Sequence, residues 1–416
     1  MTASHMRQYW RAWLSFGIAG LCLISAIIIS AVVLPTLKPL ATTTTHTLRS
    51  EPTLATVYNP DTVCAAGMSN DCHIQLTQLI STTTVTTTAG EHSDPKKADL
   101  QVGLHAHTKF DTIAPQQTLI NIDDSVQLLK NSTLPATDPQ SQITVSAPAL
   151  HLRFSTDSFA RDGVQYFFPF QAERRSYLYF DALAQDSYPI DYAGTVAIDD
   201  IPAAPPIRSD EPVTTTRHGE TAWVFQQYIA PINLSDSVFR AFTQPQVITD
   251  DPTAQPSATA IDRSKQFSID ALRLQGAADK FYPDGTTDTV QLHPYYTVQR
   301  RVWVEPTSGV ILHQVEDMYL FAARDDADAA VTAAQAGFRH DFDRMITKGD
   351  PYRTLLQARF AWDEATRTQQ RMHAAEITTS LFRIRLYPYL LKLVAAIFVI
   401  LTLLQIRNQR RRRHAS

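Results

Sequence analysis

Residues 301–312 read RVWVEPTSGVIL and give the clearest β-hairpin signal in this chain. Val302, Trp303 and Val304 precede the turn, and residues 310–312 that follow it are β-branched or aliphatic as well. Such side chains favour strands. Between the two runs, Pro306 presets the φ angle of a turn, and Gly309 can adopt the left-handed conformation before the return strand. The segment therefore predicts two antiparallel neighbours in a sheet.

The same period of two recurs through much of the chain. Seven segments, two of which contain the hairpin, are rich in β-branched or aromatic residues: 82–88, 99–113, 118–129, 221–229, 297–305, 310–319 and 354–362. These patterns are typical of strands. Residues 325–337 and 363–385 instead predict helices, because acids or a capping aspartate stand at their starts. We expect a mainly β (α+β) fold, with a curved antiparallel sheet and flanking helices.

Each end of the chain carries an apolar segment long enough to cross a bilayer. Trp13 to Leu34 is a run of 22 residues without charge, and Leu386 to Ile406 is interrupted only by Lys392. About 20 apolar residues span the hydrocarbon layer. A cleaved signal peptide is the rival interpretation of the first segment, but its apolar region usually has only about 7 to 15 residues. We therefore expect one transmembrane helix at each end.

Basic residues beside these segments predict their orientation. Arg7 and Arg11 precede the first segment, Arg407 and the arginine run 410–413 follow the second, and neither tail contains an acid. By the positive-inside rule, both termini are expected in the cytoplasm, with the chain in the plasma membrane. The expected organisation is a cytoplasmic N-terminus (1–12), a transmembrane helix (13–34), an extracytoplasmic β-rich domain (35–362), a juxtamembrane helix (363–385), a second transmembrane helix (386–406) and a cytoplasmic basic tail (407–416).

The part of the chain between the two spans is acidic. The whole chain has a net charge of −4. Residues 1–34 and 386–416 contain eight cationic residues and no acid, so residues 35–385 carry a net charge of −12. An acidic domain of this size repels phosphate backbones. We therefore exclude nucleic acid as a partner.

The cysteines agree with an oxidising compartment. Cys22 lies inside the first apolar segment, where it behaves as a small apolar residue. Cys64 and Cys72 bracket a short turn-forming loop, for which we favour a disulfide over two free thiols. A metal site is poorly supported, because His73 is the only adjacent residue of a ligand type.

Four aromatic-rich motifs give the chain a family resemblance. They are YFFPF at 166–170, YLYFDA at 177–182, YAG at 192–194 and VWVEPTSGV at 302–310. Together with the two terminal spans, they resemble the two-pass envelope membrane proteins labelled PorA family, an uncharacterised-domain family of Gram-positive bacteria with mycolic-acid envelopes. Residues 245–258 and 325–350 look like insertions relative to that pattern. The resemblance implies an envelope location and a link to lipoglycan or other cell-wall lipid assembly, and it supplies no catalytic residues.

Candidate catalytic or metal sites are few. His105 and His107 would share one face of a strand, but the sequence offers no linked acid or third histidine, so we interpret them as exposed strand residues. Asp325, Asp326 and Asp328 lack the glycine and glutamate of a calcium loop. The acid pairs 123–124 and 199–200 could serve glycoside chemistry, yet nothing fixes their separation. We expect no catalytic residues, no cofactor and no metal, and hence no enzyme.

An aromatic cluster offers the best candidate for a ligand surface. Core packing is the plain interpretation, because aromatic side chains dominate ordinary cores. The sharper one is an apolar groove for acyl chains, formed by a curved sheet with polar groups at its mouth. The lipid-contact candidates are Phe167, Phe168, Phe170, Tyr177, Tyr179 and Phe180.

Three functions remain open. The leading hypothesis is a non-catalytic, membrane-anchored protein that binds lipid or glycolipid as an accessory in envelope assembly, with membrane lipids or glycolipids and other envelope-assembly membrane proteins as partners. The alternatives are an enzyme acting on envelope glycans and an oligomeric pore. Two helices alone cannot enclose an aqueous channel, so a pore would require several copies of the chain.

Overall fold

The computed structural model describes residues 3–414 except 34–42, 90–100, 115, 130–131, 137–139, 149–151, 157, 206, 208–219, 237–273, 340–341, 343–344 and 346–349. The expected insertion at 245–258 lies outside the described residues. The chain divides into two compact units. One comprises Leu40–Ala374, and the other combines Met1–Pro39 with Ala375–Ser416.

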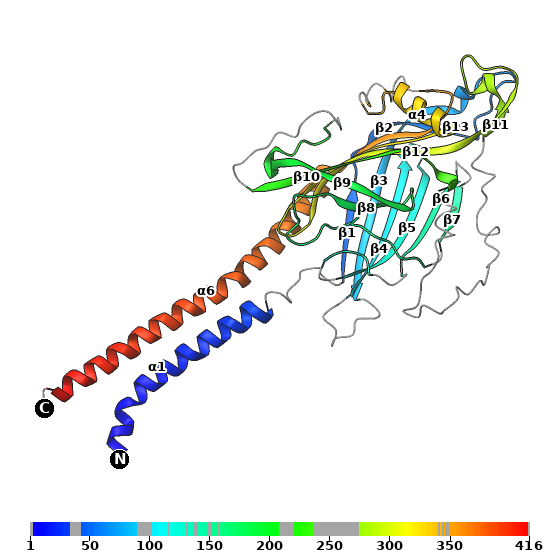
Figure 1. The fold of residues 1–416 in the computed structure, drawn as a ribbon. Coiled ribbons are helices and arrows are strands. Elements are labelled where there is room, and N and C mark those ends of the chain that lie inside the picture. Colours follow the sequence, from blue (N-terminus) through cyan, green and yellow to red (C-terminus); the bar gives the residue numbers. More distant parts are fainter. Residues whose placement is uncertain are drawn as a thin grey trace, which may run out of the picture. The chain divides into compact units, whose positions relative to one another are not determined.

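The larger unit is built on one antiparallel sheet of fourteen strands that curves into a half-barrel (Figure 1). Its main path runs β7-β6-β5-β4-β3-β2-β14-β13-β12-β10-β9-β8, while β1 pairs with β3 and β11 with β12. The strands are β1 (Thr44–Arg49), β2 (Thr53–Tyr58), β3 (Ile74–Ala89), β4 (Gln101–Thr112), β5 (Gln117–Leu129), β6 (Gln142–Ala147), β7 (Leu152–Ser155), β8 (Tyr177–Asp181), β9 (Asp186–Ala197), β10 (Thr221–Asn233), β11 (Leu274–Ala277), β12 (Thr289–Val304), β13 (Ile311–Ala323) and β14 (Thr354–Ala361).

The predicted hairpin joins β12 to β13. Glu305 closes its turn, because its carboxylate accepts hydrogen bonds from the backbone N–H groups of Thr307 and Ser308. Gly309 has a φ of 72°, and a Cβ atom at this position would lie 2.1 Å from the carbonyl oxygen of Phe168. Only glycine can therefore accept both the left-handed conformation and the close backbone approach.

The two faces of β3, β4 and β5 differ in chemistry. Along β5, Ile120, Ile122, Asp124 and Val126 are buried, while Asn121, Asp123 and Ser125 between them are partly exposed. The inward side chains join a core with those of β2, β6, β12, β13 and β14. The outward side chains are mostly Thr, Ser, His, Asp and Asn. Alternation of this kind is typical of a sheet with one face packed on the core and one face exposed to solvent.

Strands from the two ends of the larger unit meet in the middle of the sheet. β14 pairs with β2, with Leu356 opposite Val57. An isolated bridge between Ser50 and Trp362 extends this pairing. The pairing places the first strands of the domain beside the last one.

Helix α4 and the first turns of helix α6 belong to the larger unit. Helix α4 (Asp326–Gln335) starts at Asp325, whose side chain accepts a hydrogen bond from the N–H of Asp328, and it packs on β10 and β13. This agrees with the helix expected at 325–337. Helix α6 (Glu364–His414) starts after Asp363, which caps it by accepting from the N–H of Thr366. Within the larger unit, Thr366 also accepts a hydrogen bond from the N–H of Arg49 in β1.

The smaller unit consists of helix α1 (Ala3–Ile28), its π-helical continuation (Ile29–Val33) and the rest of α6. α6 is continuous through Pro388. Both helices contain segments that are long and apolar enough to cross a membrane, by length and composition alone. The fold is thus mainly β with a helix at each end, as expected.

Candidate functional site

A segment of chain crosses the inner side of the sheet from one edge strand to the other. Residues 158–176, called here the crossing segment, follow β7 and lead into β8, which are the two ends of the main strand path. Phe159 bridges to Ser141 before β6, and Val164 bridges to Tyr179 in β8. Further on, the N–H of Phe168 donates to the carbonyl of Gly309. The hairpin and both sheet edges therefore hold this segment.

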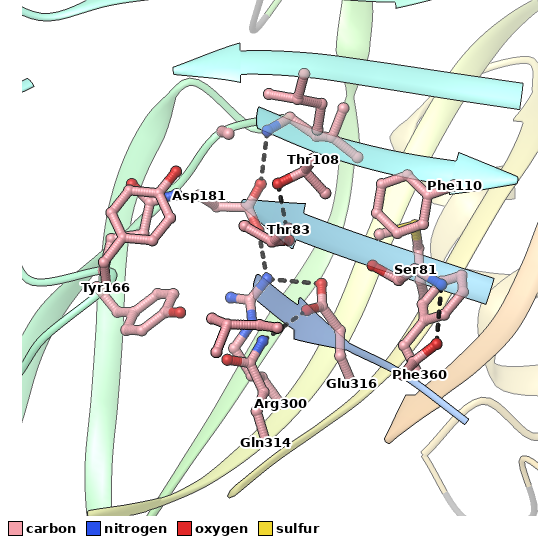
Figure 2. Close-up of a pocket in the computed structure, with 18 of the residues that line it drawn as sticks. Ser81, Thr83, Thr108, Phe110, Tyr166, Asp181, Arg300, Gln314, Glu316 and Phe360 are labelled. Atoms are coloured by element: carbon pink, nitrogen blue, oxygen red, sulfur yellow. Dashed lines mark hydrogen bonds and ion pairs between the residues drawn. The ribbon is translucent and has the colours of Figure 1, made fainter. Parts of the chain in front are cut away.

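A cavity of about 140 Å³ lies between the crossing segment and the inner face of the sheet. Figure 2 shows polar groups on several strands pointing into it. At the roughly 30 Å³ that each molecule occupies in liquid water, it has room for several water molecules. Its polar lining residues are Ser50, Ser81, Thr83, Thr108, Gln165, Asp181, Arg300, Gln314 and Glu316, and aromatic side chains such as Phe110, Tyr179 and Phe360 complete the wall.

Arg300 is the central group of this lining. One of its nitrogens, Nη2, donates to Asp181 Oδ2 and to Glu316 Oε1, both at 2.8 Å. Its Nη1 donates to Gln227, and its guanidinium carbon lies 4.9 Å from the centre of the Tyr179 ring. One cation therefore serves two carboxylates in a buried site.

Asp181 is fixed by four donors. Its Oδ1 accepts from the N–H groups of Leu183 and Ala184, and its Oδ2 accepts from the hydroxyl of Tyr296 at 3.0 Å as well as from Arg300. We call Asp181, Tyr296, Arg300 and Glu316 the Arg300 cluster. With one arginine and two carboxylates, the cluster carries a formal charge of −1.

Burial and charge act against each other in this cluster. Burial alone would lower the pKa of the Arg300 guanidinium, but the carboxylates of Glu316 and Asp181 outweigh it and raise that pKa well above its ordinary value. Burial raises the pKa of Tyr179 to about 12. Burial, followed by the charges of Asp181 and Glu316, raises the pKa of Tyr296 well above 10. At neutral pH the guanidinium is therefore charged and both phenols are neutral, so the Tyr296 hydroxyl can donate to Asp181.

A second buried arginine anchors the crossing segment to β5. Arg161 Nη1 donates to both oxygens of Asp124, at 2.9 and 3.0 Å, and the Tyr166 hydroxyl donates to Asp124 Oδ2 at 2.7 Å. We call Asp124, Arg161 and Tyr166 the Arg161 cluster. It is neutral, because one cation meets one carboxylate.

The structure divides the six lipid-contact candidates between different surroundings. Phe168 and Tyr177 are buried in a core with Phe225, while Phe167 and Phe170 pack partly buried against β3, β4 and β5. Tyr179 and Phe180 contribute to the cavity wall. The candidates therefore do not form one continuous apolar groove.

The remaining sequence candidates also lie apart. Cys64 and Cys72 form a disulfide, with their Cα atoms 5.9 Å apart, so these thiols cannot join His73 in holding a metal. Asp123 and Asp124 point to opposite faces of β5, and Asp199 and Asp200 lie at the end of β9. Because the carboxylates of Asp123 and Asp124 lie on opposite faces of β5, they cannot flank one glycosidic bond.

The sequence patterns did not predict either arginine cluster. Asp124 occupies the inward phase of β5, between Ile122 and Val126, and this position was a usable signal for a buried charge. Asp181 was quoted only as part of an aromatic motif. Its partners Arg300 and Glu316 come from β12 and β13, and no local pattern connects them to β8.

Comparison with known proteins gives two results. The family described as Porin PorA matches residues 12–404. A protein named Porin PorA from Corynebacterium amycolatum is 30% identical over 291 residues, which cover 70% of this chain but only 65% of that protein. Another of the same name from Corynebacterium resistens is 30% identical over 349 residues, which cover 79% of this chain and 77% of that protein. This chain thus spans slightly less than two thirds of the first relative.

The leading sequence-based hypothesis, a lipid- or glycolipid-binding accessory protein, is wrong. The family and both relatives carry the name of a porin. The cavity gives a lipid groove no support either, because its volume of about 140 Å³ is well below the roughly 300–1,000 Å³ of typical ligand pockets and charged and polar groups share its wall with apolar side chains. The relatives support a location in the cell envelope, but not the finer expectation of a plasma-membrane protein with cytoplasmic termini.

Proposed function

The chain belongs to the PorA porin family, and from this membership we propose that it forms a water-filled channel through a membrane of the cell envelope. The family match is the observation that carries the proposal. A porin is a channel rather than an enzyme, in agreement with the non-catalytic interpretation of the sequence. The pore was the alternative that the sequence left open.

The chemistry of the sheet supports a channel whose membrane part is helical. A transmembrane β-barrel turns an apolar band toward the lipid. The outward side chains of β3, β4 and β5 instead include Thr84, His107 and Asp123. These hydrogen-bonding and charged groups would lose their hydration in hydrocarbon, which disfavours them on the lipid face of a barrel.

Most large apolar side chains that are exposed among the described residues lie on α1 and α6. On α1 they are Trp10, Trp13, Leu14, Phe16, Leu21, Leu23, Ile24, Ile27 and Ile28, and on α6 they include Phe382, Leu386, Leu390, Leu393, Ile397, Ile400 and Leu404. We propose that these helices contact the lipid. If both helices cross, the two basic ends would lie on the same side of the membrane.

The channel requires several copies of the chain. Two helices cannot enclose water, since each must satisfy its backbone internally and the space between a packed pair is filled by side chains. Helices from neighbouring copies would complete the wall, so the proposed partner is a further copy of this chain. The net charge of −12 on residues 35–385 favours cations over anions at the mouth.

Planar-bilayer recording of the purified full-length chain tests this function. We expect stepwise conductance, with a reversal potential in a salt gradient that reports preference for cations. A matched control carries Leu23→Arg and Ile27→Arg, because each arginine at the centre of a span costs about 2.5–3.5 kcal/mol of insertion free energy. The control should lose the conductance, while the β domain should unfold at the same midpoint temperature as in the intact chain. Equal conductance from the intact chain, the control and a detergent blank would refute the proposal.

A further inference from the structure

A pair of histidines lies where the first strand of the domain meets the first turns of α6. His46 belongs to β1, opposite Val85 of β3, and His373 belongs to α6. The centres of the two imidazole rings are 4.7 Å apart, and their planes are tilted by 48°. Both residues lie in the larger unit, so their contact is part of one compact body.

Two sets of contacts join α6 to β1. At the start of the helix, the Thr366 hydroxyl accepts a hydrogen bond from the N–H of Arg49. Further along the helix, Gln369 and His373 contact the ring of His46. The first contact uses a hydroxyl and a backbone group, which do not titrate near neutral pH, whereas the second depends on an imidazole.

The hydrogen bond of His46 determines which of its nitrogens can take up a proton. Nδ1 lies 3.4 Å from Nε2 of Gln369, an amide nitrogen that can only donate, so Nδ1 is the acceptor. The neutral ring then carries its proton on Nε2, which is buried and has no hydrogen-bond partner among the described residues. A second proton would have to bind Nδ1, where it would face the donor of Gln369. A flip of that amide could restore the hydrogen bond but would leave the new charge in place.

A charge on His46 would stand where water cannot surround it. The two histidine rings border a cavity of only about 20 Å³, and Leu48, Val85 and Ile311 form part of its wall. A space of this size holds no more than about one water molecule. Burial accordingly lowers the pKa of His46 below its ordinary value of 6.5.

The neighbouring charges do not stabilise a cation at this place. The titratable and charged residues on the elements packed around the two rings are Arg49 of β1, Tyr166 of the crossing segment, His313 of β13, and Glu364, Arg367, Arg371 and Glu376 of α6. Burial raises the pKa of Tyr166 well above 10, and burial lowers the pKa of His313 to about 3, so both are neutral near pH 6. Glu364 pairs with Arg367, and Glu376 is exposed to solvent.

We propose that His46 and His373 form a pH-sensitive latch that holds residues 369–373 of α6 against β1 at neutral pH and releases them in a mildly acidic medium. A proton on Nδ1 of His46 removes the hydrogen bond from Gln369 and places a cation against the second ring. The contact at Thr366 persists, so only this part of the helix separates from the strand. The released ring binds its proton near pH 6.5 and the latched ring binds it less readily, so the latched state loses stability as pH falls below about 6.5.

Hydrogen–deuterium exchange of the full-length chain in detergent, read by mass spectrometry, tests the latch. After correction for intrinsic exchange rates, the protection of the amides of residues 369–373 should fall by up to about tenfold between pH 7.5 and 5.5, because release is coupled to one proton. His46→Gln should abolish this fall, since its amide cannot take up a proton in this range. The matched control is His105→Gln, whose side chain is 56% exposed on β4, and it should keep the fall.

Two further variants separate the latch from other effects of pH. His313→Gln removes the other buried imidazole and should keep the loss of protection at residues 369–373. His373→Phe keeps a ring against His46 but cannot carry a charge, so the loss should be smaller than in the wild type. Circular dichroism at pH 7.5 shows whether each variant is folded.

Protection of residues 369–373 that is the same at both pH values in the wild type would overturn the proposal. An equal loss in the wild type and in His46→Gln would overturn it as well, and so would the absence of any loss in His105→Gln. If His46→Gln does not fold, an equal loss in the wild type and in His373→Phe counts against the latch. Amide exchange requires no conductance, so the outcome does not depend on whether the chain forms a channel.

Discussion

The two buried arginine clusters on the inner side of the sheet use the same residue types but differ in charge balance. In the Arg161 cluster, one guanidinium meets the carboxylate of Asp124, and Tyr166 completes the site. In the Arg300 cluster, one guanidinium serves two carboxylates, and Tyr296 donates to Asp181. The first cluster is neutral and the second carries an excess negative charge.

This difference separates two roles that buried charges can have. The Arg161 cluster anchors the crossing segment to β5, and its hydrogen bonds satisfy both carboxylate oxygens. The Arg300 cluster links β8, β12 and β13 and also faces the cavity. Both clusters should therefore contribute to stability, whereas only the Arg300 cluster places unbalanced charge beside the enclosed space.

Replacing Arg300 by Met should have the largest effect on stability. The change leaves Asp181 and Glu316 buried without their shared cation, and breaking a buried ion pair in this way costs about 3–5 kcal/mol. We expect the free energy of unfolding to fall by that amount in urea titrations followed by tryptophan fluorescence. The triple variant Arg300→Met, Asp181→Asn, Glu316→Gln should recover part of the loss. A loss below about 1 kcal/mol would show that the cluster is hydrated rather than buried.

Replacing Arg161 by Met should have a smaller effect. This change leaves only the carboxylate of Asp124 without its cation, and Tyr166 continues to donate a hydrogen bond to it. We therefore expect the free energy of unfolding to fall by an amount near the lower limit of about 3 kcal/mol. The same urea titration measures it, and limited proteolysis should show earlier cleavage within the crossing segment. If Arg161→Met proves more damaging than Arg300→Met, the number of stranded carboxylates does not determine the cost.

The pH dependence of stability extends the comparison to His313, a buried side chain that would carry a charge without a counter-charge. Burial lowers the pKa of His313 to about 3, and the nearby cations Arg367 and Arg371 act in the same direction. Because the unfolded chain binds this proton near pH 6.5, the native state loses stability as pH falls from about 6.5 toward 3. Between pH 6.5 and 5.0 the loss from this residue should approach about 2 kcal/mol. The His313→Gln variant should lack that part of the pH dependence, and an unchanged slope would show that the native imidazole is protonated.

Replacing Glu316 by Gln should change stability least. Arg300 then faces Asp181 alone, as Arg161 faces Asp124, and the cluster becomes neutral. The amide that replaces this carboxylate has a single oxygen, which can keep the hydrogen bond from Arg300, while its NH2 group faces Gln314, whose own amide can turn to present an oxygen. We expect a change of less than about 1 kcal/mol in either direction. A loss as large as that of Arg300→Met would show that the second carboxylate is required for the fold.

The sequence predicted the longer strands that are rich in β-branched or aromatic residues, whether one face is exposed, as in β5, or both are buried, as in β14 (Thr354–Ala361). The expected strand at 118–129 corresponds to β5 (Gln117–Leu129), because its inward aliphatic residues alternate with outward polar ones. β8 (Tyr177–Asp181) was recognised only as an aromatic motif, since the sequence YLYFD shows little alternation. β6 (Gln142–Ala147) lies in a proline-flanked polar stretch that does not stand out as a strand. The Arg300 cluster could not be predicted, because only the order of strands in the sheet brings residue 181 to residues 300 and 316.

The pairing of β14 with β2 has a consequence for the order in which the domain is made. Val57 finds its neighbour Leu356 only after some three hundred residues have followed it along the chain. Until then, one edge of β2 keeps unpaired backbone groups, and such edges can pair wrongly with other chains. Non-local pairing of this kind also slows folding, since a long loop must close before the contact forms. A newly made chain therefore stays vulnerable to aggregation until its final strand arrives, and a chaperone that shields β2 during this interval would raise the folding yield.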